Sequence, residues 1–321
     1  MSKLTIAVTD HVFPNLDHAE RVLSGLDAEI RLASEPTEEA ILEVAREADG
    51  LMVTFAQITA GLISGLERCK SIGRFGIGVD NIDLEAATKA GIQVTYVPDY
   101  CVDEVSDHAL TLLLSLARKI PEANSLVQSG RWSAADLAPV YRIRGRTLGL
   151  AGLGKIPQTL APKAQALGMT VIAADPFVPA EVAKSLDVEL VDFDTLLARS
   201  DYISIHAPLT DETHHMFDAD AFGKMKNEAL LINTARGPLI DEEALVAALD
   251  AGEIGGAALD VITTEPPAAD FPLLGRDNVI LTPHAAFYSV DALVDLQTKA
   301  AEDVVAVLTG KTPRYPVNKL D

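Results

Sequence analysis

The sequence predicts an α/β fold with two doubly wound parallel sheets, and three observations lead to this prediction. Short apolar runs, which are typical of buried parallel strands, alternate with helical stretches along most of the chain. A glycine-rich turn at residues 152–154 stands between one such run and the helical stretch that follows it. The chain has 321 residues, which favours two domains over one.

Composition narrows the class of protein. The net charge of −21 argues against binding to nucleic acid or to an anionic membrane. No apolar run is long enough for a membrane span, and the first residues lack the apolar core of a secretory signal. Cys69 and Cys101 form no metal-binding or disulfide pattern, so we expect no metal site and a reducing, cytoplasmic location.

The first hundred residues are expected to form one α/β unit. We expect its strands at residues 3–9, 28–32, 50–54, 71–75 and 93–96, and its helices at residues 16–26, 37–47, 60–66 and 84–90. The turn Phe75-Gly76-Ile77-Gly78 follows the fourth strand, and ligands bind beyond the carboxyl ends of parallel strands. This turn is therefore either a backbone site for a small anion or a tight turn that merely requires glycine.

The following residues, to about 287, are expected to form a second and larger α/β unit. It begins with a long helix from residue 102 to about residue 129, and a loop with Trp132 follows. We expect strands at residues 147–151, 169–174, 188–190, 202–206, 229–233, 256–261 and 279–281, and helices at residues 155–167, 192–199, 219–225 and 241–251. A last long helix is expected at residues 289–308.

The stretch from Thr147 to Asp175 has the features of a dinucleotide-binding unit. Gly152 and Gly154 carry no side chain, so backbone amides can approach a pyrophosphate, and the helix that follows directs its positive end toward it. Asp175 stands where a carboxylate accepts hydrogen bonds from ribose hydroxyls and repels a 2′-phosphate. The pattern favours NAD over NADP, and an ordinary βαβ unit with a glycine-rich turn is the alternative.

Two prolines depart from the usual pattern of this unit. Pro157 occupies the position where a small residue normally lets the helix pack closely on the strand. A proline is tolerated in the first turn of a helix, but Pro162 lies deeper and removes a hydrogen bond. We expect a kinked or locally displaced helix with the phosphate turn intact.

Arg236, Glu265 and His284 each follow a predicted strand of the second unit. The reduction of a carbonyl group requires a hydride and a proton, and histidine is the usual proton donor near neutral pH. A neighbouring carboxylate orients an imidazole, and the guanidinium fork of arginine suits a carboxylate or a carbonyl oxygen. The three residues suit the reduction of a 2-keto acid, although each is also compatible with a purely structural role.

Several motifs resemble those of the D-isomer-specific 2-hydroxyacid dehydrogenases, over essentially the whole chain. They are GRFGIGVDNIDLEAATKAGI, VPDYCVDEVSDHAL, GLAGLG, HAPLTDETHHMF, LLINTARGPLIDEEAL, GAALDV with TEPP, and TPHAAFYS. The last motif is most similar to the C-terminal-binding-protein-like branch. The resemblance implies an NAD-binding Rossmann domain, residues 101–287, inserted into a flavodoxin-like substrate-binding domain made of residues 1–100 and 288–321. It also implies that helices 102–119 and 289–308 join the two domains.

The resemblance also assigns roles to residues. His284 would be the proton donor and acceptor, Glu265 its partner, and Arg236 the group that binds the substrate's carboxylate and carbonyl. The backbone at Ile77 and Gly78 would complete the carboxylate site. Contacts with NAD are expected at Gly152, Gly154, Lys155, Ile156, Asp175, Ala207, Pro208, Thr213, Thr234, Ala235, Asp260 and His284.

The implied function is that of an NAD-dependent D-2-hydroxyacid dehydrogenase, an oxidoreductase that acts on CH–OH groups as a homodimer formed through the NAD-binding domain. Glyoxylate, hydroxypyruvate and phosphoglycerate-type substrates all fit the motifs. The alternative is an NAD(H)-sensing, corepressor-like interaction protein with incidental dehydrogenase activity. We expect the pocket for the substrate's side chain near Phe55, Arg74, Tyr100 and Phe287. Arg74 either favours a second anionic group or forms a structural ion pair.

Overall fold

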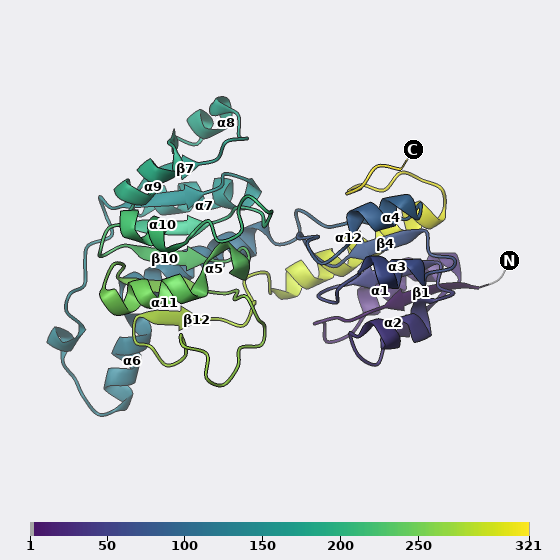
Figure 1. Cartoon of the computed structure of the whole chain (residues 1–321), viewed down its shortest axis with the longest axis horizontal. Coiled ribbons are helices and arrows are strands. Elements are labelled where there is room, and N and C mark those ends of the chain that lie inside the picture. The colour runs from purple at the N-terminus through teal and green to yellow at the C-terminus, as the bar shows by residue number, and fades with distance from the viewer. Residues whose placement is uncertain (1–2, 321) are drawn as a thin grey trace. The chain divides into compact units, whose positions relative to one another are not determined.

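The computed structural model describes residues 3–320, and it divides into two compact units. One unit, here called the terminal unit, comprises the chain up to Cys101 and the residues from Tyr288 onward. The other, the central unit, is Val102–Phe287. Each unit is described by itself below, with the helices and strands labelled in Figure 1.

The terminal unit is built on a five-stranded parallel sheet with the strand order β2-β1-β3-β4-β5. Its strands are β1 (Leu4–Val8), β2 (Ala28–Leu32), β3 (Gly50–Val53), β4 (Ser71–Arg74) and β5 (Gln93–Thr95). Its helices are α1 (Asp17–Leu23), η1 (Ser24–Leu26), α2 (Glu38–Ala45), α3 (Ala60–Ser64), α4 (Leu84–Lys89) and α12 (Val290–Leu308). The order of the strands reverses between β1 and β3, which makes this the topological switch point of the sheet.

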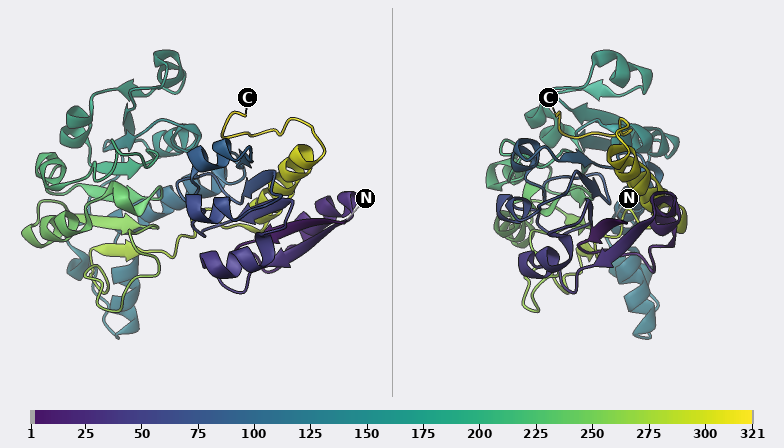
Figure 2. Two further views of the ribbon diagram at one scale, coloured as in Figure 1. Left: turned by 45° about the vertical axis from the view of Figure 1, so that its right-hand side comes forward. Right: turned by 90° about the vertical axis from the view of Figure 1, so that its right-hand side faces the viewer.

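The C-terminal helix α12 belongs to the terminal unit because it packs on that unit's sheet. Figure 2 shows it, in yellow, alongside the strands. Gly50 of β3 and Gly73 of β4 leave the space that Val304 of α12 fills, since a Cβ atom at either glycine would press against its side chain. A second apolar core, which includes Ile41, Leu62 and Ile72, contains residues of α2, α3 and α4 and of the strands. Helices therefore cover both faces of the sheet.

The central unit contains a seven-stranded parallel sheet with the order β12-β11-β10-β9-β6-β7-β8. Its strands are β6 (Thr147–Ala151), β7 (Thr170–Ala174), β8 (Glu189–Leu190), β9 (Tyr202–Ile205), β10 (Leu230–Asn233), β11 (Gly256–Leu259) and β12 (Val279–Leu281). Its helices are α5 (Val102–Ala117), α6 (Ile120–Gln128), η2 (Ala134–Leu137), α7 (Lys155–Ala166), α8 (Ala180–Ser185), α9 (Phe193–Arg199), α10 (Ala219–Lys224), η3 (Gly237–Leu239) and α11 (Glu242–Ala251).

Two apolar cores lie on opposite faces of the central sheet. One contains residues of α9, α10 and α11, and the other contains residues of α5, α7 and α8. Neighbouring strand residues alternate between the cores, as in β10, where Leu231 belongs to the first core and Ile232 to the second. This arrangement confirms the predicted doubly wound sheet. The switch point of this sheet lies between β6 and β9.

Three local expectations need correction or refinement. The helix expected from residue 102 to about 129 is two helices, α5 and α6, because Lys119 takes a φ of 51° and Pro121 stands in the first turn of α6. The α8 helix was not anticipated from the sequence. The α7 helix is continuous from Lys155 to Ala166, so Pro162 does not interrupt it. Within residues 3–320, no helix is both long and apolar enough to cross a membrane.

Candidate active site

Glu265 and His284 form a close pair at the carboxyl edge of the central sheet. Glu265 lies in the loop after β11, and His284 lies in the loop after the neighbouring strand β12. His284 Nδ1 and Glu265 Oε2 are 2.8 Å apart, and Glu265 Oε1 accepts a hydrogen bond from the Ile262 amide at 3.2 Å. The carboxylate therefore fixes the imidazole ring so that Nε2 points away from Glu265.

The backbone of His284 is held in the left-handed region, with a φ of 51°. Its amide donates to the Asp260 carbonyl oxygen at 2.8 Å. The carboxylate of Asp260, which is only 2% exposed, accepts hydrogen bonds from Thr282 Oγ1 at 2.5 Å and from the amides of Ala285 and Ala286 at 2.9 and 2.8 Å. Asp260 thus fixes the loop on both sides of His284 and stabilises its unusual backbone conformation.

The pKa of Asp260 reflects this role. Burial by itself raises the pKa of a carboxyl group, but hydrogen bonding with His108, Thr282 and the two amides outweighs burial and holds the pKa of Asp260 below its ordinary value. His108 Nε2 lies 3.1 Å from Thr282 Oγ1 and so belongs to the same network. The family resemblance implied that Asp260 contacts the cofactor, and it did not reveal that Asp260 also holds this loop.

Arg236 lies after β10, the strand next to β11, so its loop joins the same edge of the sheet. The buried Asn233 shapes this loop: its side chain donates to the Arg236 carbonyl oxygen at 2.8 Å and accepts from the Ala235 amide at 2.9 Å. One guanidinium nitrogen of Arg236 donates to the Ala235 carbonyl at 2.7 Å. The neighbouring Gly237 is required because a Cβ atom there would collide with the backbone of Ile262.

The glycine-rich turn lies at the switch point between β6 and β9. Gly152 has a φ of 98°, and a Cβ atom there would lie 2.9 Å from the carbonyl oxygen of His206, so only glycine fits. A Cβ atom at Gly154 would meet nothing within 4 Å. Gly154 is the N-cap of α7, and no side chain caps this 12-residue helix. The first amides of α7 therefore face open space, as an anion site requires.

Asp175 ties the end of β7 to the glycine-rich turn. One carboxylate oxygen accepts from the Leu153 amide at 2.8 Å, and the other accepts from the amides of Phe177 and Val178 at 2.8 and 3.1 Å. The oxygen that accepts from Leu153 still has a lone pair for a ribose hydroxyl. The carboxylate is thus held in the position that a dinucleotide requires of it.

The loops after β9 and β10 complete the edge around the switch point. The Thr213 hydroxyl donates to the Pro208 carbonyl at 2.6 Å and accepts from the Thr210 amide at 2.8 Å, which folds the loop that begins at Ala207. The Thr234 hydroxyl is buried and has no hydrogen-bond partner within the protein, as expected of a group that faces a bound polar molecule. Burial lowers the pKa of His206 to about 3, so its imidazole carries no charge at neutral pH.

These features test whether the central unit fits a dinucleotide. Uncapped amides at α7, open space at Gly154, the fixed carboxylate of Asp175 and the unpartnered hydroxyl of Thr234 are the donors and acceptors that NAD needs. The fit is therefore good. Lys155 and Ile156 lie in the first turn of α7, where the resemblance expects the pyrophosphate.

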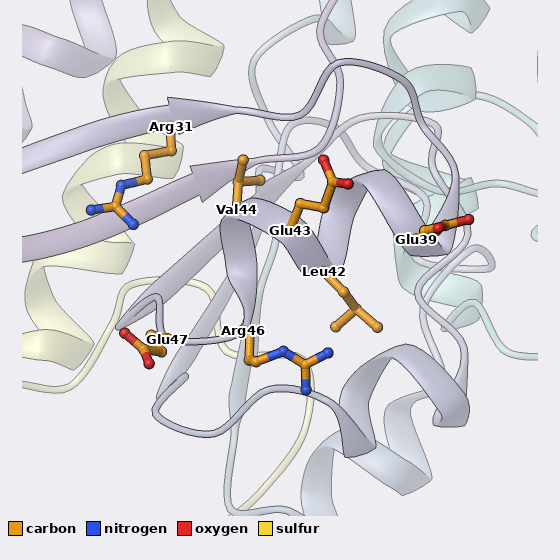
Figure 3. Close-up of a pocket in the computed structure, with 7 residues that line it drawn as sticks. All are labelled: Arg31, Glu39, Leu42, Glu43, Val44, Arg46 and Glu47. Atoms are coloured by element: carbon orange, nitrogen blue, oxygen red, sulfur yellow. The ribbon is translucent and has the colours of Figure 1, made fainter.

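The remaining predicted residues are divided between the units. Phe287, in the central unit, lies edge-on to the His284 ring with centroids 6.3 Å apart. Ile77 and Gly78 lie in the turn after β4 of the terminal unit, where the Gly76 carbonyl accepts from the Val97 amide at 2.9 Å. A hollow of about 460 Å³ on the terminal unit is formed by Arg31 and α2 and contains none of the predicted site residues (Figure 3).

The comparisons with known proteins agree with this geometry. Residues 110–286 match the family model described as "D-isomer specific 2-hydroxyacid dehydrogenase, NAD binding domain". The chain is 41% identical to the D-3-phosphoglycerate dehydrogenase of Archaeoglobus fulgidus, an alignment that covers 92% of this chain and 56% of that protein. It is 35% identical to the glyoxylate reductase of Korarchaeum cryptofilum, which covers 96% of both chains.

A solved structure is similar over nearly the whole chain. The D-lactate dehydrogenase of Aquifex aeolicus, solved with NAD and lactic acid, has a TM-score of 0.86 and 29% identity, and the match covers 95% of this chain and 96% of that one. The chain spans a little over half the length of the first phosphoglycerate dehydrogenases that it matches. The resemblance to the C-terminal-binding-protein branch stays a prediction. With its NAD-binding unit and its full-length similarity to the glyoxylate reductase, the chain belongs to the D-isomer specific 2-hydroxyacid dehydrogenase family.

Proposed function

We propose that this protein is an NAD-dependent dehydrogenase that interconverts a 2-keto acid and a D-2-hydroxy acid. The observation that carries the proposal is the His284–Glu265 pair, 2.8 Å apart, in the loops after β12 and β11, and β11 pairs with β10, the strand that leads to Arg236. Relatives named for phosphoglycerate, glyoxylate and lactate support it, because those acids all have an oxygen on the carbon next to a carboxylate. NAD supplies the chemistry of hydride transfer at that carbon.

The residues of the chain supply the proton and the orientation. In the reductive direction, His284 gives the proton on Nε2 to the carbonyl oxygen as the alkoxide develops, and in oxidation it takes that proton back. Glu265 holds Nδ1–H, so Nε2 is the nitrogen that exchanges the proton. Arg236 binds the substrate's carboxylate and carbonyl through its fork. In the terminal unit, we assign the backbone of Ile77 and Gly78 to carboxylate binding.

The direct test is loss of NADH absorbance with a panel of 2-keto acids: glyoxylate, hydroxypyruvate, pyruvate, 2-ketoisocaproate and 3-phosphohydroxypyruvate. Rapid turnover of at least one of them with NADH, and slower turnover with NADPH, is the expected result. The preference for NADH follows from Asp175, which repels a 2′-phosphate. If NADH binds tightly by fluorescence but no acid is reduced, the enzyme proposal fails and an NAD(H)-sensing role takes its place.

The phosphate turn offers a second test with a matched control. Gly154→Ala places a methyl group in open space, so it should leave the fold intact but occupy the position of a phosphate. We expect the Kd for NADH to rise by about tenfold or more, which corresponds to the loss of roughly one charge-assisted hydrogen bond. Gly223→Ala, in α10, also adds a methyl group in open space and should leave the Kd unchanged. Equal affinities in the two variants would contradict the assignment of the turn.

We also propose that the protein forms a homodimer through the central unit. Helix α6 and the loop after it carry exposed apolar side chains: Ile120 is 54%, Val127 45% and Trp132 89% exposed, and α6 has no buried residue. Such a surface is typical of an interface between copies. Trp132→Glu combined with Val127→Glu should convert a dimer into a monomer in light scattering. Leu274→Glu, at a site of similar exposure, should not.

A cytoplasmic location is part of the same proposal. Burial raises the pKa of the Cys69 thiol to about 12, so this cysteine stays protonated and unreactive. A reducing compartment suits such a cysteine. Fractionation of the native cells, with this protein followed by antibody, tests the location.

A further inference from the structure

The switch point of the terminal sheet is already filled by a carboxylate of the chain itself. Asp10 follows β1, and it accepts hydrogen bonds from three consecutive amides after β3: Thr54 at 3.1 Å, Phe55 at 2.6 Å and Ala56 at 3.3 Å. Three consecutive amides that converge on one point are a typical anion site. Because Asp10 occupies them, they are not available to an anionic group of a ligand.

The loop that Asp10 holds is also joined to the turn that contains Ile77 and Gly78. The side-chain amide of Asn81, which is 9% exposed, donates to the carbonyl oxygens of Thr54 and Ala56 at 3.2 and 2.8 Å. Strands β3 and β4 pair in parallel, with Val53 opposite Arg74, so Phe55 follows β3 at the level where Gly76 follows β4. A substrate held by its carboxylate at Ile77 and Gly78 therefore has Phe55 beside it.

The charge at this edge is negative. The first residues after the five strands, at positions 9–13, 33–37, 54–58, 75–80 and 96–101, include four carboxylates and neither lysine nor arginine. The carboxylates are those of Asp10, Glu35, Asp80 and Asp99, and Asp99 forms an ion pair with Lys299 of α12 at 3.3 Å. A phosphate group would lose water here and meet charges of its own sign.

Arg74 is the only lysine or arginine that forms the last residue of one of these five strands, and its side chain makes structural contacts within the terminal unit. It is 7% exposed, its guanidinium donates to the Phe75 carbonyl, and it fills the space where a Cβ atom of Gly76 would lie. Its guanidinium also lies 6.0 Å from the centre of the Phe55 ring. Of the two roles that the sequence left open for Arg74, these contacts favour the structural one.

Two of the side chains exposed at this edge are apolar. Val12 and Phe55 are each 41% exposed, and Asp10 joins the loops that carry them. Behind them His11 stacks on Phe13, and Phe13 packs edge-on against Phe75 with centroids 4.9 Å apart. An aliphatic group placed against Val12 and Phe55 would leave water without leaving any charge unpaired.

We propose that the substrate is a 2-keto acid with an uncharged, aliphatic side chain, and that Phe55 determines this specificity. The proposal rests on the proposed dehydrogenase function and names the substrate class of that same site. It excludes a phosphorylated or dicarboxylic substrate, since the residues just after the five strands of the terminal unit include no lysine or arginine for a second anionic group.

The test compares kcat/KM for 2-ketoisocaproate, glyoxylate and 3-phosphohydroxypyruvate with NADH and the full chain. We expect 2-ketoisocaproate to exceed 3-phosphohydroxypyruvate by about 100-fold or more, the scale of discrimination that a pocket achieves with unpaired polar groups. A first rank for 3-phosphohydroxypyruvate overturns the proposal while leaving the dehydrogenase function intact. No turnover of any acid, with NADH bound, overturns the dehydrogenase function instead.

Two variants test whether Phe55 determines the preference between substrates. Phe55→Ala should lower the ratio of kcat/KM for 2-ketoisocaproate over glyoxylate by about tenfold, since it removes apolar contact from the longer substrate only. Phe55→Lys should raise the ratio for 3-phosphohydroxypyruvate over 2-ketoisocaproate by about tenfold or more, because it adds a cation. Both ratios are measured within one preparation, so partial misfolding cannot change them. Leu274→Ala should leave both ratios as in the parent protein, and unchanged ratios in both Phe55 variants would overturn the role of Phe55.

Discussion

The carboxyl edges of the two sheets are organised in the same way but present different chemistry. At each edge, one aspartate near the end of a strand accepts hydrogen bonds from consecutive amides of a neighbouring loop. Asp10 holds the amides of residues 54–56 in the terminal unit, and Asp260 holds those of residues 285–286 in the central unit. The loop that Asp10 fixes carries Phe55, whereas the loop that Asp260 fixes carries His284.

Both sheets have the same fold type, so the difference between their edges lies in the side chains that the fixed loops carry. Fixing a loop adds no chemistry by itself. Under the proposed function, the side chain on the fixed loop decides whether the edge exchanges protons or selects the shape and charge of a substrate. The central edge presents Arg236, Glu265 and His284, all of them polar. The terminal edge presents backbone amides and the exposed apolar side chains of Val12 and Phe55, and Arg74 at this edge is buried.

The largest expected effect concerns the side chain at the central edge. His284→Ala should lower kcat/KM by about 10²–10⁴-fold, the usual contribution of a general acid. Glu265→Gln keeps an acceptor for Nδ1–H but loses the charge, so it should cost less than the loss of the imidazole. Steady-state kinetics with the preferred keto acid measures both. Activity of His284→Ala within a few-fold of the parent would show that the central edge is not where the proton is exchanged.

The two arginines sharpen the comparison. Arg236→Lys retains the charge but loses the fork, so we expect kcat/KM to fall by about 10²-fold with thermal stability unchanged. Arg74→Lys loses a buried guanidinium that donates to the Phe75 carbonyl, so it should lower the free energy of unfolding by about 1–3 kcal/mol. Calorimetry and kinetics on both variants separate the roles. If Arg74→Lys lowered activity without lowering stability, Arg74 would instead be a substrate-binding residue.

The smallest effect is a dependence of stability on pH that arises from Asp260. Its pKa is lowered in the folded protein, so its contribution to stability is present above the pKa of an unfolded aspartate and is lost as the pH falls through the folded value. The stability difference between the parent and Asp260→Asn should be constant near neutral pH and shrink below about pH 4. Urea unfolding at several pH values measures it, and a difference that grew toward acid pH would reverse the sign of the argument.

Sequence reasoning was most successful where a local pattern has one physical meaning. The alternation of apolar strands and helices predicted both parallel sheets, and the glycine spacing predicted a turn between a strand and a helix, which the structure has between β6 and α7. It was least successful where the end of a helix depends on one residue. The long helix ends at Ala117 because Pro121 has no amide hydrogen to donate to the preceding turn. The apolar pattern continues past this point, so it predicted one continuous helix.

The candidate active site shows the same contrast between what a local sequence pattern predicts and what it does not. The sequence by itself determined which residues have the chemistry, since histidine, glutamate and arginine after successive strands must reach one edge of a parallel sheet. Only the tertiary structure decided what Asp10, Arg74 and Asp260 do. The partners of the two aspartates lie from 22 to 46 positions away in the sequence. The contact of Arg74 depends on how its side chain folds back on the next residue. Such contacts arise from strand register and loop closure, and no local pattern in a sequence records them.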